Sequence, residues 1–268
     1  MMTSQSKYDV LISEVGPRDG LQSVKATMAT ADKFKWIDAL HASGIRDIEV
    51  ASFVPARLLP QMADAAEIVK YALTKPGWTV MALVPNLRGA QAALQAGVHK
   101  ITVPVSASAA HSLANVRMTR EAMVEEVRCI AALRRDMAPG VKLEAGMSTA
   151  FGCTLQGAVT DDDVVWLAAA VIEAGADEIG LSDTTGMANP AQVRTCSTGC
   201  APRLASALAP PTCTTHAAWA WPIAWQRMTW VCARSMPHWV VWAAAPTHLA
   251  PPATWSLKTW FSCSKPWA

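Results

Sequence analysis

The chain has 268 residues, a formal net charge of +2 and 51% hydrophobic residues, which suits one large α/β domain or two small ones. No stretch is apolar for long enough to predict a membrane-spanning helix, and no secretory leader is visible, so we expect a cytoplasmic protein without a membrane partner. Seven cysteines, an odd number without a regular framework, fit a reducing compartment better than a disulfide scaffold.

The charge is distributed unevenly along the chain. All 21 acidic residues lie at or before Asp183, whereas 6 of the 23 basic residues lie from Arg194 onward. Residues 1–193 therefore carry a net charge of −4 and the remaining 75 residues carry +6. Six charges spread over such a length form too weak a patch to predict nucleic-acid binding, so we expect no nucleic-acid partner.

The first predicted strand leads into a cluster of charged residues. Residues 8–13 are rich in β-formers, and Gly16-Pro17 is a turn signal that closes them. Glu14, Arg18 and Asp19 should therefore lie at the C-terminal end of this strand, where a barrel enzyme carries its catalytic residues. The alternative is a solvated surface turn with an ion pair. We favour a functional role because the side chains of adjacent residues in a tight turn are expected to diverge.

An internal repeat predicts the fold. Residues 42–50, 95–103 and 173–181 each read as a helix end, a glycine and a β-branched run. Glycine just past a helix adopts the left-handed conformation that satisfies the last carbonyls, and the run that follows enters a sheet. The three glycines are 53 and 78 residues apart, which is two and three multiples of about 26, a plausible length for one strand-plus-helix unit.

Helices are predicted between these strands. One is expected after Thr30 as N-cap, with Phe34, Ile37 and Leu40 at helical spacing and Asp32 in its first turn. A second is expected after Thr160, which three aspartates follow; its buried residues should be Val164, Leu167 and Val171. Strands that alternate with helices at this period predict an α/β protein with a closed (β/α)₈ TIM barrel, whose strand six ends near Asp183.

The domain organisation follows from a change of character at Arg194. We predict that residues 1–193 form a barrel domain with six recognisable βα units, and that residues 194–268 form an atypical tail. Nine of the 12 tryptophans and nine of the 17 prolines fall in this tail, and neither helical nor strand periodicity persists there. Proline blocks long helices and central strands alike, so the last quarter of the barrel is expected to be irregular.

Five blocks of sequence in residues 8–193 resemble the 3-hydroxy-3-methylglutaryl-CoA lyase family, a group of metal-dependent TIM-barrel carbon–carbon lyases. They occur in the family's order, and chance agreement at five places is remote. The blocks are EVGPRDGLQ (Glu14–Gln22), IEVASFV (Ile48–Val54), VPNL (Val84–Leu87), AFGC (Ala150–Cys153) and LSDTTG (Leu181–Gly186).

The resemblance implies a reaction and residues for it. Retro-Claisen cleavage of a 3-hydroxyacyl-CoA needs a base for the hydroxyl proton, a cation that holds hydroxyl and carboxylate, and positive charge beside the thioester enolate. By resemblance, Asp19 is a ligand of a divalent metal, Mg or Mn, and Arg18 neutralises the enolate oxygen. Glu14, Glu49 and Asp183 then line the pocket at the ends of strands one, two and six.

Structural roles compete with these assignments. Glu49 lies inside an apolar run, where an uncompensated carboxylate costs several kcal/mol, so a functional role is favoured. Asp183 could instead cap the next turn. Gln22 is a candidate substrate contact, as are His111 and Asn115 in the expected loop after strand four, although a solvated loop histidine is an equal alternative.

Cys153 lies in one of the family blocks, but its thiol is better read as buried and structural. No histidine or basic residue lies near it in the sequence to lower its pKa.

The unusual composition of the tail can be explained by a frameshift. With suitable synonymous codons, a shift of one nucleotide turns residues 212–220 into HLHNTRGLG and residues 238–252 into LGGLGGCPYAPGASG, which resemble the lyase family. We therefore hypothesise a frameshift near Val193 or Arg194. The family completes its metal site with a His-x-His pair on strand seven and an asparagine beyond strand eight, and its glycine-rich loop brings in a cysteine. None of these occurs in the printed frame.

The expected function is a lyase that cleaves 3-hydroxy-3-methylglutaryl-CoA, or a close 3-hydroxyacyl-CoA, to acetyl-CoA and acetoacetate. Its partner would be the acyl-CoA substrate, and a homodimer is an assembly that the resemblance allows. Aldolases and synthases of the same superfamily are the nearest rivals. The alternative from another class is a catalytically dead remnant that associates with other molecules through its Trp-rich tail.

Overall fold

The computed structural model describes residues 13–193, 195–196, 212–215, 240–243 and 259–262. Within these ranges nine strands form one closed barrel in chain order. The strands are β1 (Ser13–Glu14), β2 (Asp47–Ser52), β3 (Thr79–Leu83), β4 (Lys100–Ser106), β5 (Lys142–Ser148), β6 (Glu178–Asp183), β7 (Thr212–Thr215), β8 (Val240–Ala243) and β9 (Thr259–Ser262).

Strands β1 to β8 pair in parallel with their neighbours. Strand β9 is antiparallel to both β8 and β1 and closes the barrel between them. The α/β barrel prediction is confirmed, and so is the end of strand six at Asp183. The antiparallel closing strand departs from a regular (β/α)₈ barrel, and the three short strands of the tail were not visible in its sequence pattern.

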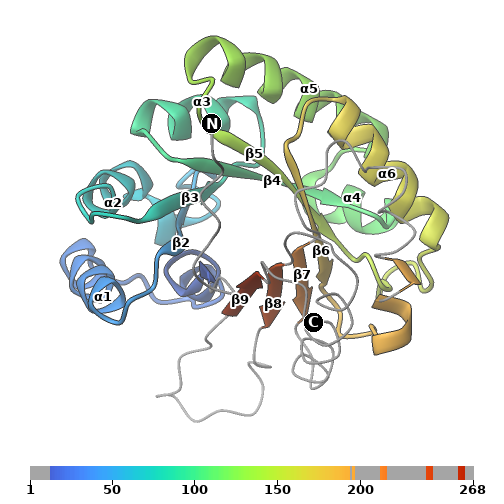
Figure 1. Cartoon of the computed structure of the whole chain (residues 1–268), viewed down its shortest axis with the longest axis horizontal. Helices are drawn as coiled ribbons and strands as arrows, with labels where there is room; N and C mark the ends of the chain where they lie inside the picture. The colour runs from blue at the N-terminus through green and yellow to red at the C-terminus, as the bar shows by residue number, and fades with distance from the viewer. Residues whose placement is uncertain (1–12, 194, 197–211, 216–239, 244–258, 263–268) are drawn as a thin grey trace, which may run out of the picture.

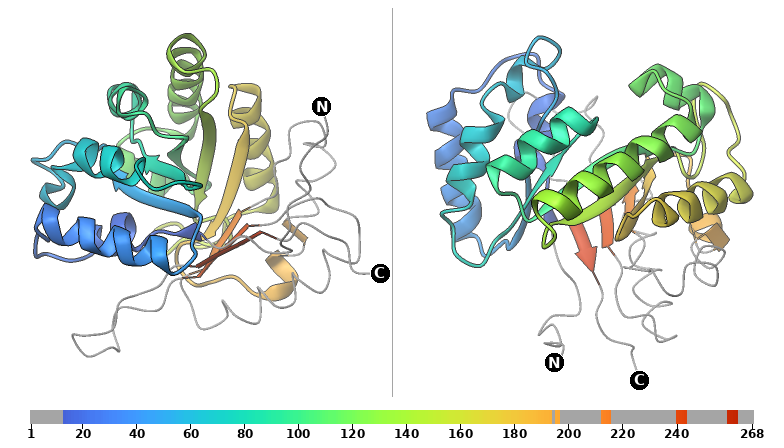
Figure 2. Two further views of the ribbon diagram at one scale, coloured as in Figure 1. Left: turned by 60° about the vertical axis from the view of Figure 1, so that its left-hand side comes forward. Right: turned by 90° about the horizontal axis from the view of Figure 1, so that it is seen from above.

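Helices surround the outside of the strands (Figure 1). Two short helical turns, η1 (Gly16–Gly20, π-helical) and η2 (Pro60–Met62), accompany them. The views in Figure 2 show α1, α2 and α3 on one side of the barrel and α5 beside α6 on the other. The helices are α1 (Thr30–Ala42), α2 (Ala65–Ala72), α3 (Leu87–Ala96), α4 (Ala109–Val116), α5 (Arg120–Met137) and α6 (Asp161–Glu173).

The three glycines of the internal repeat act as predicted. Gly44, Gly97 and Gly175 have φ angles of 91°, 91° and 110°, in the left-handed region. Each lies between a helix and the strand that follows, β2, β4 or β6. The repeat therefore marks real helix-to-strand junctions, because a side chain would be strained in this conformation.

The two predicted helix starts have different outcomes. Thr160 caps α6 as predicted, since its Oγ1 accepts a hydrogen bond from the N–H of Asp163 at 3.1 Å. Thr30 does not cap α1: the helix begins at Thr30 itself, and Ala29 occupies the cap position without a side-chain bond. A tertiary contact takes the hydroxyl instead, because Thr30 Oγ1 donates to Asp64 Oδ2 at 2.8 Å.

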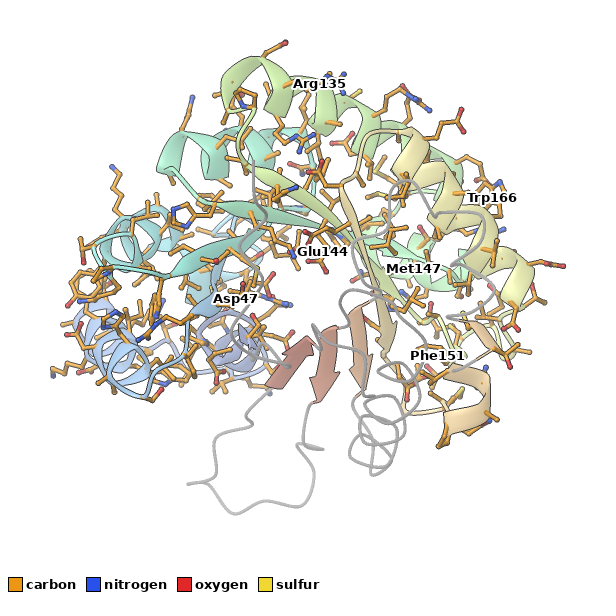
Figure 3. The ribbon with its side chains drawn as sticks, viewed as in Figure 1. Asp47, Arg135, Glu144, Met147, Phe151 and Trp166 are labelled. Atoms are coloured by element: carbon orange, nitrogen blue, oxygen red, sulfur yellow. The ribbon has the colours of Figure 1, made fainter. Side chains whose placement is uncertain are left out.

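Two kinds of side chain alternate along the central strands. In β4 and β5 one face is apolar and fully buried, as with Ile101 and Leu143. The residues between them, such as Lys100 and Glu144, turn into the barrel, as Figure 3 shows for Glu144. Period-two alternation thus gives the barrel a hydrophobic outer layer under the helices and a polar interior.

Four charged residues meet at the N-terminal end of the barrel interior, and we call them the floor cluster: Asp47, Lys100, Glu144 and Glu178. Lys100 Nζ lies 2.5 Å from Glu144 Oε2 and 2.6 Å from Glu178 Oε2. Burial raises the pKa of Glu144 to about 7 and that of Asp47 to about 6, although Lys100 opposes both shifts. One ammonium thus faces three carboxyl groups, of which Glu144 is about half protonated at neutral pH and Asp47 gains its proton about one pH unit lower.

None of the helices in the described ranges combines the length and the apolar character needed to cross a bilayer.

The floor cluster predicts how stability depends on pH. A carboxyl whose pKa is raised in the folded state binds a proton that the unfolded chain has already lost, so its stabilising effect disappears as the pH rises toward the folded value. Between pH 5 and 8, Glu144 alone should lower the free energy of unfolding by about 2 kcal/mol. Urea unfolding at pH steps across this range measures the slope.

Glu144→Gln should flatten that dependence, because glutamine cannot titrate and Lys100 keeps Glu178 as its partner. The matched control is Glu125→Gln on α5, whose carboxylate is exposed and pairs with Arg128. An unchanged slope in Glu144→Gln would contradict the assignment.

Candidate active site

A tight turn after β1 presents the charged residues of the first block. Pro17 is the second residue of η1, and the N–H groups of Arg18 and Asp19 both donate to the carbonyl of Val15, at 3.1 and 2.7 Å. Since η1 directly follows a parallel strand, it lies at the C-terminal mouth of the barrel. This is the end at which barrel enzymes carry their catalytic residues.

Arg18 forms the centre of a buried charge cluster. Its Nε donates to Glu49 Oε2 at 2.6 Å, and its Nη2 contacts the same oxygen. Its Nη1 lies 2.8 Å from Asp19 Oδ1. Arg18 is 7% exposed and Glu49 is 0% exposed. The expectation that the side chains of Arg18 and Asp19 diverge is wrong, because the guanidinium fork is wide enough to meet its neighbour and β2 together.

Glu49 reaches Arg18 from the barrel interior. It is the third residue of β2, on the same face as Asp47, and the pairing of β2 with β3 shifts between Glu49 and Ala51. Such bulges redirect side chains and occur often beside active sites. The second carboxylate oxygen, Oε1, is buried and has no hydrogen-bond partner among the described residues. An acceptor in that state is suited to a proton donor supplied by a ligand.

Glu14 has a different position from Glu49. Its register partner is Ile48, so it belongs to the face of β1 that turns toward the helices. Its Oε1 accepts the N–H of Gly16 at 2.5 Å. Burial raises the pKa of the Glu14 carboxyl, against the opposite effect of the backbone N–H groups of Gly16 and Val15. Glu14 therefore holds the turn that presents Arg18.

Asp183 also binds its own loop. The fully buried carboxylate at the end of β6 accepts the N–H groups of Met187 at 3.0 Å and Ala188 at 3.2 Å. The capping role considered as an alternative is therefore present, although through Met187 and Ala188 instead of the adjacent threonines. Arg18, Glu49 and Asp183 do lie on strands or turns that open at one end of the barrel.

The predicted substrate contacts divide into two groups. Gln22 and Asn115 are exposed. His111 is half-buried, and its Nδ1 lies 2.8 Å from the hydroxyl of Ser106, the last residue of β4. The expected loop around His111 and Asn115 is wrong: both belong to α4, because Ser108 caps that helix by accepting the N–H of His111.

Cys153 is buried as predicted, but its environment is not inert. Burial raises the pKa of the thiol, yet hydrogen bonds from the Ser108 side chain and the backbone of Leu155 and Gln156 outweigh it and lower the pKa overall. Neutral donors therefore replace the cationic neighbour that was absent from the sequence.

The described residues supply only part of the donor set of a divalent-metal site. No group of three or more His, Cys, Asp or Glu side chains that could hold a metal ion occurs among the described residues. Asp19 supplies one carboxylate at the mouth, and Arg18 engages it. These side chains alone do not fit the near-octahedral donor set that Mg²⁺ prefers.

Sequence reasoning missed Ser106 and the floor cluster. The signal for the cluster was present, since Lys100 and Glu144 interrupt otherwise apolar strands at alternate positions. The bond from Ser106 to His111 was hidden because it depends on α4 folding back over the end of β4.

Comparison with known proteins identifies the family to which the chain is similar. Residues 9–216 match the family model described as HMGL-like. The chain is 38% identical over 187 residues to a hydroxymethylglutaryl-CoA lyase of Bacillus subtilis, covering 69% of this chain and 62% of the relative. It is 37% identical over 185 residues to a 3-hydroxy-3-isohexenylglutaryl-CoA/hydroxymethylglutaryl-CoA lyase of Pseudomonas aeruginosa, covering 69% and 61%.

Among solved structures, an HMG-CoA lyase of Acinetobacter baumannii in complex with coenzyme A and 3-methylmalate superposes with a TM-score of 0.76 at 28% identity. That superposition covers 96% of this chain and 82% of the other. The matched segment thus spans somewhat less than two thirds of the two curated relatives.

The first site prediction concerns the buried ion pair. Arg18→Met should destabilise the fold by about 3 kcal/mol or more at pH 7, because it leaves Glu49 buried without its partner. The double variant Arg18→Met/Glu49→Gln should recover most of that loss. Urea unfolding measures both, with Lys35→Met as the control for an exposed pair, Lys35 with Asp32, whose contribution to stability is small. Additive losses in the double variant would contradict the pairing.

The second site prediction concerns the turn. A Cβ on Gly16 would lie 2.7 Å from Glu14 Oε1 and 3.0 Å from the ring of Trp36, whereas a Cβ on Gly20 would meet nothing within 4 Å. Gly16→Ala should therefore cost about 1–3 kcal/mol of stability, and Gly20→Ala within about 0.5 kcal/mol. Equal effects in thermal unfolding would show that Glu14 and Trp36 do not confine the turn.

Proposed function

The chain belongs to the HMGL-like family, and from that premise we propose that it is by function a carbon–carbon lyase acting on 3-hydroxy-3-methylglutaryl-CoA or a close 3-hydroxyacyl-CoA. The products would be acetyl-CoA and acetoacetate. The second curated relative, whose name includes a larger glutaryl-CoA substrate, supports the wider substrate range.

The observation that carries the proposal is the buried cluster of Arg18, Glu49 and Asp19 at the mouth of the barrel. A guanidinium with so little exposure exerts its charge in a medium of low dielectric constant. An enolate oxygen formed beside it would be stabilised more strongly than in water. Solvated surface pairs offer no such gain.

The proposed reaction divides among these groups as follows. The bond between the second and third carbons of the acyl chain breaks, its electron pair passes to the thioester as an enolate, and the hydroxyl proton leaves to a base. Arg18 would neutralise the enolate oxygen. The unpartnered Oε1 of Glu49, on the carboxylate that pairs with Arg18, would accept a hydrogen bond from the substrate. Glu14 and Asp183 would act by holding the two loops in place.

We further propose a divalent cation, Mg or Mn, with Asp19 as one ligand. When bound, such a cation would hold the hydroxyl and carboxylate oxygens of the substrate together. The remaining donors would have to come from residues beyond β6. Mn²⁺ binding followed by electron paramagnetic resonance should weaken in Asp19→Asn.

Strand β7 gives the frameshift hypothesis a structural counterpart. The shifted reading of residues 212–220 begins with His-Leu-His, so its two histidines fall on positions 212 and 214. These positions pair with Gly180 and Ser182, on the face of β6 that also carries Glu178 of the floor cluster. Sequencing the codons around Val193 tests this, because an intact frame would refute it.

The competing proposal is a remnant without activity that associates through its Trp-rich tail. It is favoured by the missing His-x-His pair in the printed frame. Superfamily members that form the bond instead of breaking it are a further alternative. A cytoplasmic location remains part of the main proposal, based on the cysteine usage.

One assay separates these proposals. The chain as printed and a version with the shifted tail restored are each incubated with 3-hydroxy-3-methylglutaryl-CoA and Mg²⁺ or Mn²⁺, and acetyl-CoA release is measured. We expect the restored version to exceed the printed chain by more than about 100-fold, since even outer-shell losses at metal sites cost 10- to 100-fold.

Within the restored version, Asp19→Asn should abolish the gain, whereas Asp162→Asn, an exposed carboxylate on α6, should not. Inactivity of both versions would refute the lyase proposal, and equal activity would refute the remnant.

A further inference from the structure

One residue at the mouth of the barrel has a backbone conformation that its own side chain disfavours. Thr149 follows directly after β5 and has a φ angle of 56°, in the left-handed region. Among the described residues that are not glycine, only Thr149 and Arg117 have a positive φ. Arg117 is exposed at the end of α4, whereas Thr149 is 0% exposed. A β-branched residue rarely adopts this conformation, and such strain persists only where the surrounding structure enforces it, often at functional sites.

The left-handed conformation directs two neighbouring N–H groups to the same strand. In a regular strand, the N–H groups of consecutive residues point to opposite neighbours. Here the N–H of Thr149 donates to Thr184 Oγ1 at 2.8 Å, and the N–H of Ala150 donates to the Ser182 carbonyl at 3.2 Å. Both bonds therefore reach the end of β6, and they hold the residues on either side of Asp183.

The side chain of Thr149 binds in the opposite direction, toward β4. Its Oγ1 donates to the Ser148 carbonyl at 2.7 Å and accepts the N–H of Ser108 at 3.2 Å. The Ser108 hydroxyl in turn caps α4 by accepting the N–H of His111. A glycine would adopt this φ angle without strain, but it has no hydroxyl to accept the bond from Ser108. One threonine thus joins the ends of β4, β5 and β6.

The segments after β5 and β6 stay in contact beyond Thr149. The Thr185 hydroxyl donates to the Gly152 carbonyl at 2.9 Å, and Gln192 Nε2 donates to the Phe151 carbonyl at 3.0 Å (Figure 3). A Cβ on Gly152 would lie 2.7 Å from the sulfur of Met187, so no space separates the two segments there. A displacement at Thr149 would therefore be passed on to Met187, whose N–H the carboxylate at the end of β6 accepts.

We propose that Thr149 is a positioning residue of the mouth, which fixes Asp183 and the start of α4 relative to β5. Its left-handed backbone supplies the two bonds to β6, and its hydroxyl supplies the bond to the segment after β4. Because it is fully buried, it would act through these neighbours and not on a substrate. The inference rests on the proposed function in one respect, that the mouth is the active site.

Hydrogen exchange of the full chain, followed by NMR, tests the proposal. Thr149→Val keeps the shape of the side chain but removes the hydroxyl. The amides of Ser108, Ala150 and Met187 should then exchange about threefold to tenfold faster, the effect of one lost neutral hydrogen bond on local opening. Thr149→Ser keeps the hydroxyl and should retain the rates of the unsubstituted chain.

Core amides separate a local effect from general destabilisation. The amides of Ile48 and Ile101, in β2 and β4, should keep their rates in Thr149→Val. Thr184→Val provides a second variant if Thr149→Val does not fold, because it removes only the side-chain acceptor of the Thr149 N–H. It should speed exchange at Met187 as well. The matched control is Thr74→Val after α2, which removes a hydroxyl bonded to the Tyr71 carbonyl and should change none of these rates.

Three results would overturn the inference: unchanged exchange at the mouth in the valine variants, equal acceleration of the core amides, or failure of Thr149→Ser to retain the original rates. In the version with the restored tail, Thr149→Val should lower kcat for acetyl-CoA release by about tenfold or more and change KM little. An unchanged kcat there would also overturn it. Inactivity of the restored version would refute the lyase proposal alone, because the exchange rates decide the role of Thr149 independently.

Discussion

The carboxylate of Glu49 sits inside a closed barrel with no exposed surface, and the guanidinium of Arg18 is what makes its charge tolerable there. Burial of an ionised group costs several kcal/mol unless a partner and hydrogen bonds offset it. That requirement ties η1 to β2 across the first two strands. The turn must therefore adopt the conformation in which Pro17 lies in its first positions and Glu14 holds its first N–H, that of Gly16.

The same constraint operates at the other end of the barrel. Lys100 pairs with Glu144 and Glu178, and burial raises the pKa of Glu144 and of Asp47 although the charge of Lys100 opposes both shifts. The charge on Glu49 contributes to the shift of Glu144, so the floor cluster and the mouth are electrostatically connected. In a barrel whose interior is polar, the protonation of the floor cluster therefore depends on the charge of the residues at the mouth, and the two titrate together.

The features that could be predicted from the sequence are those set by the conformational preferences of neighbouring residues. The left-handed glycines, the cap of α6 and the end of β6 at Asp183 follow from conformational preferences of a few adjacent residues, and all are present. Thr30 fails as a cap for the opposite reason, since Asp64, 34 residues away, takes its hydroxyl. The contact of Arg18 with both Asp19 and Glu49 likewise depends on the register of two strands.

The same difference between local and long-range constraints explains which roles within the predicted site could be foreseen. Residue type and order located the mouth, yet they could not tell a carboxylate that faces the interior from one that faces its own loop. Alternation within β1 distinguishes Glu14 from Glu49 only once the register Glu14 to Ile48 is known. Asp183 occupies a position in β6 that alternates with that of Glu178, and its carboxylate accepts hydrogen bonds from the backbone of its own loop.

A carboxylate that holds a loop is as necessary to an active site as one that touches substrate, because a displacement of about 1 Å at the reacting atoms can cost on the order of 100-fold in rate. Glu14 and Asp183 fix the turns that follow β1 and β6, while the Ser108 hydroxyl does the same after β4. Three buried polar side chains, each just after or at the end of a different strand, thus fix the loops of the mouth. The mouth is shaped by groups that bond to backbone, and the side chains left for chemistry are those, such as Glu49 through its Oε1, whose hydrogen-bonding capacity the described fold does not use.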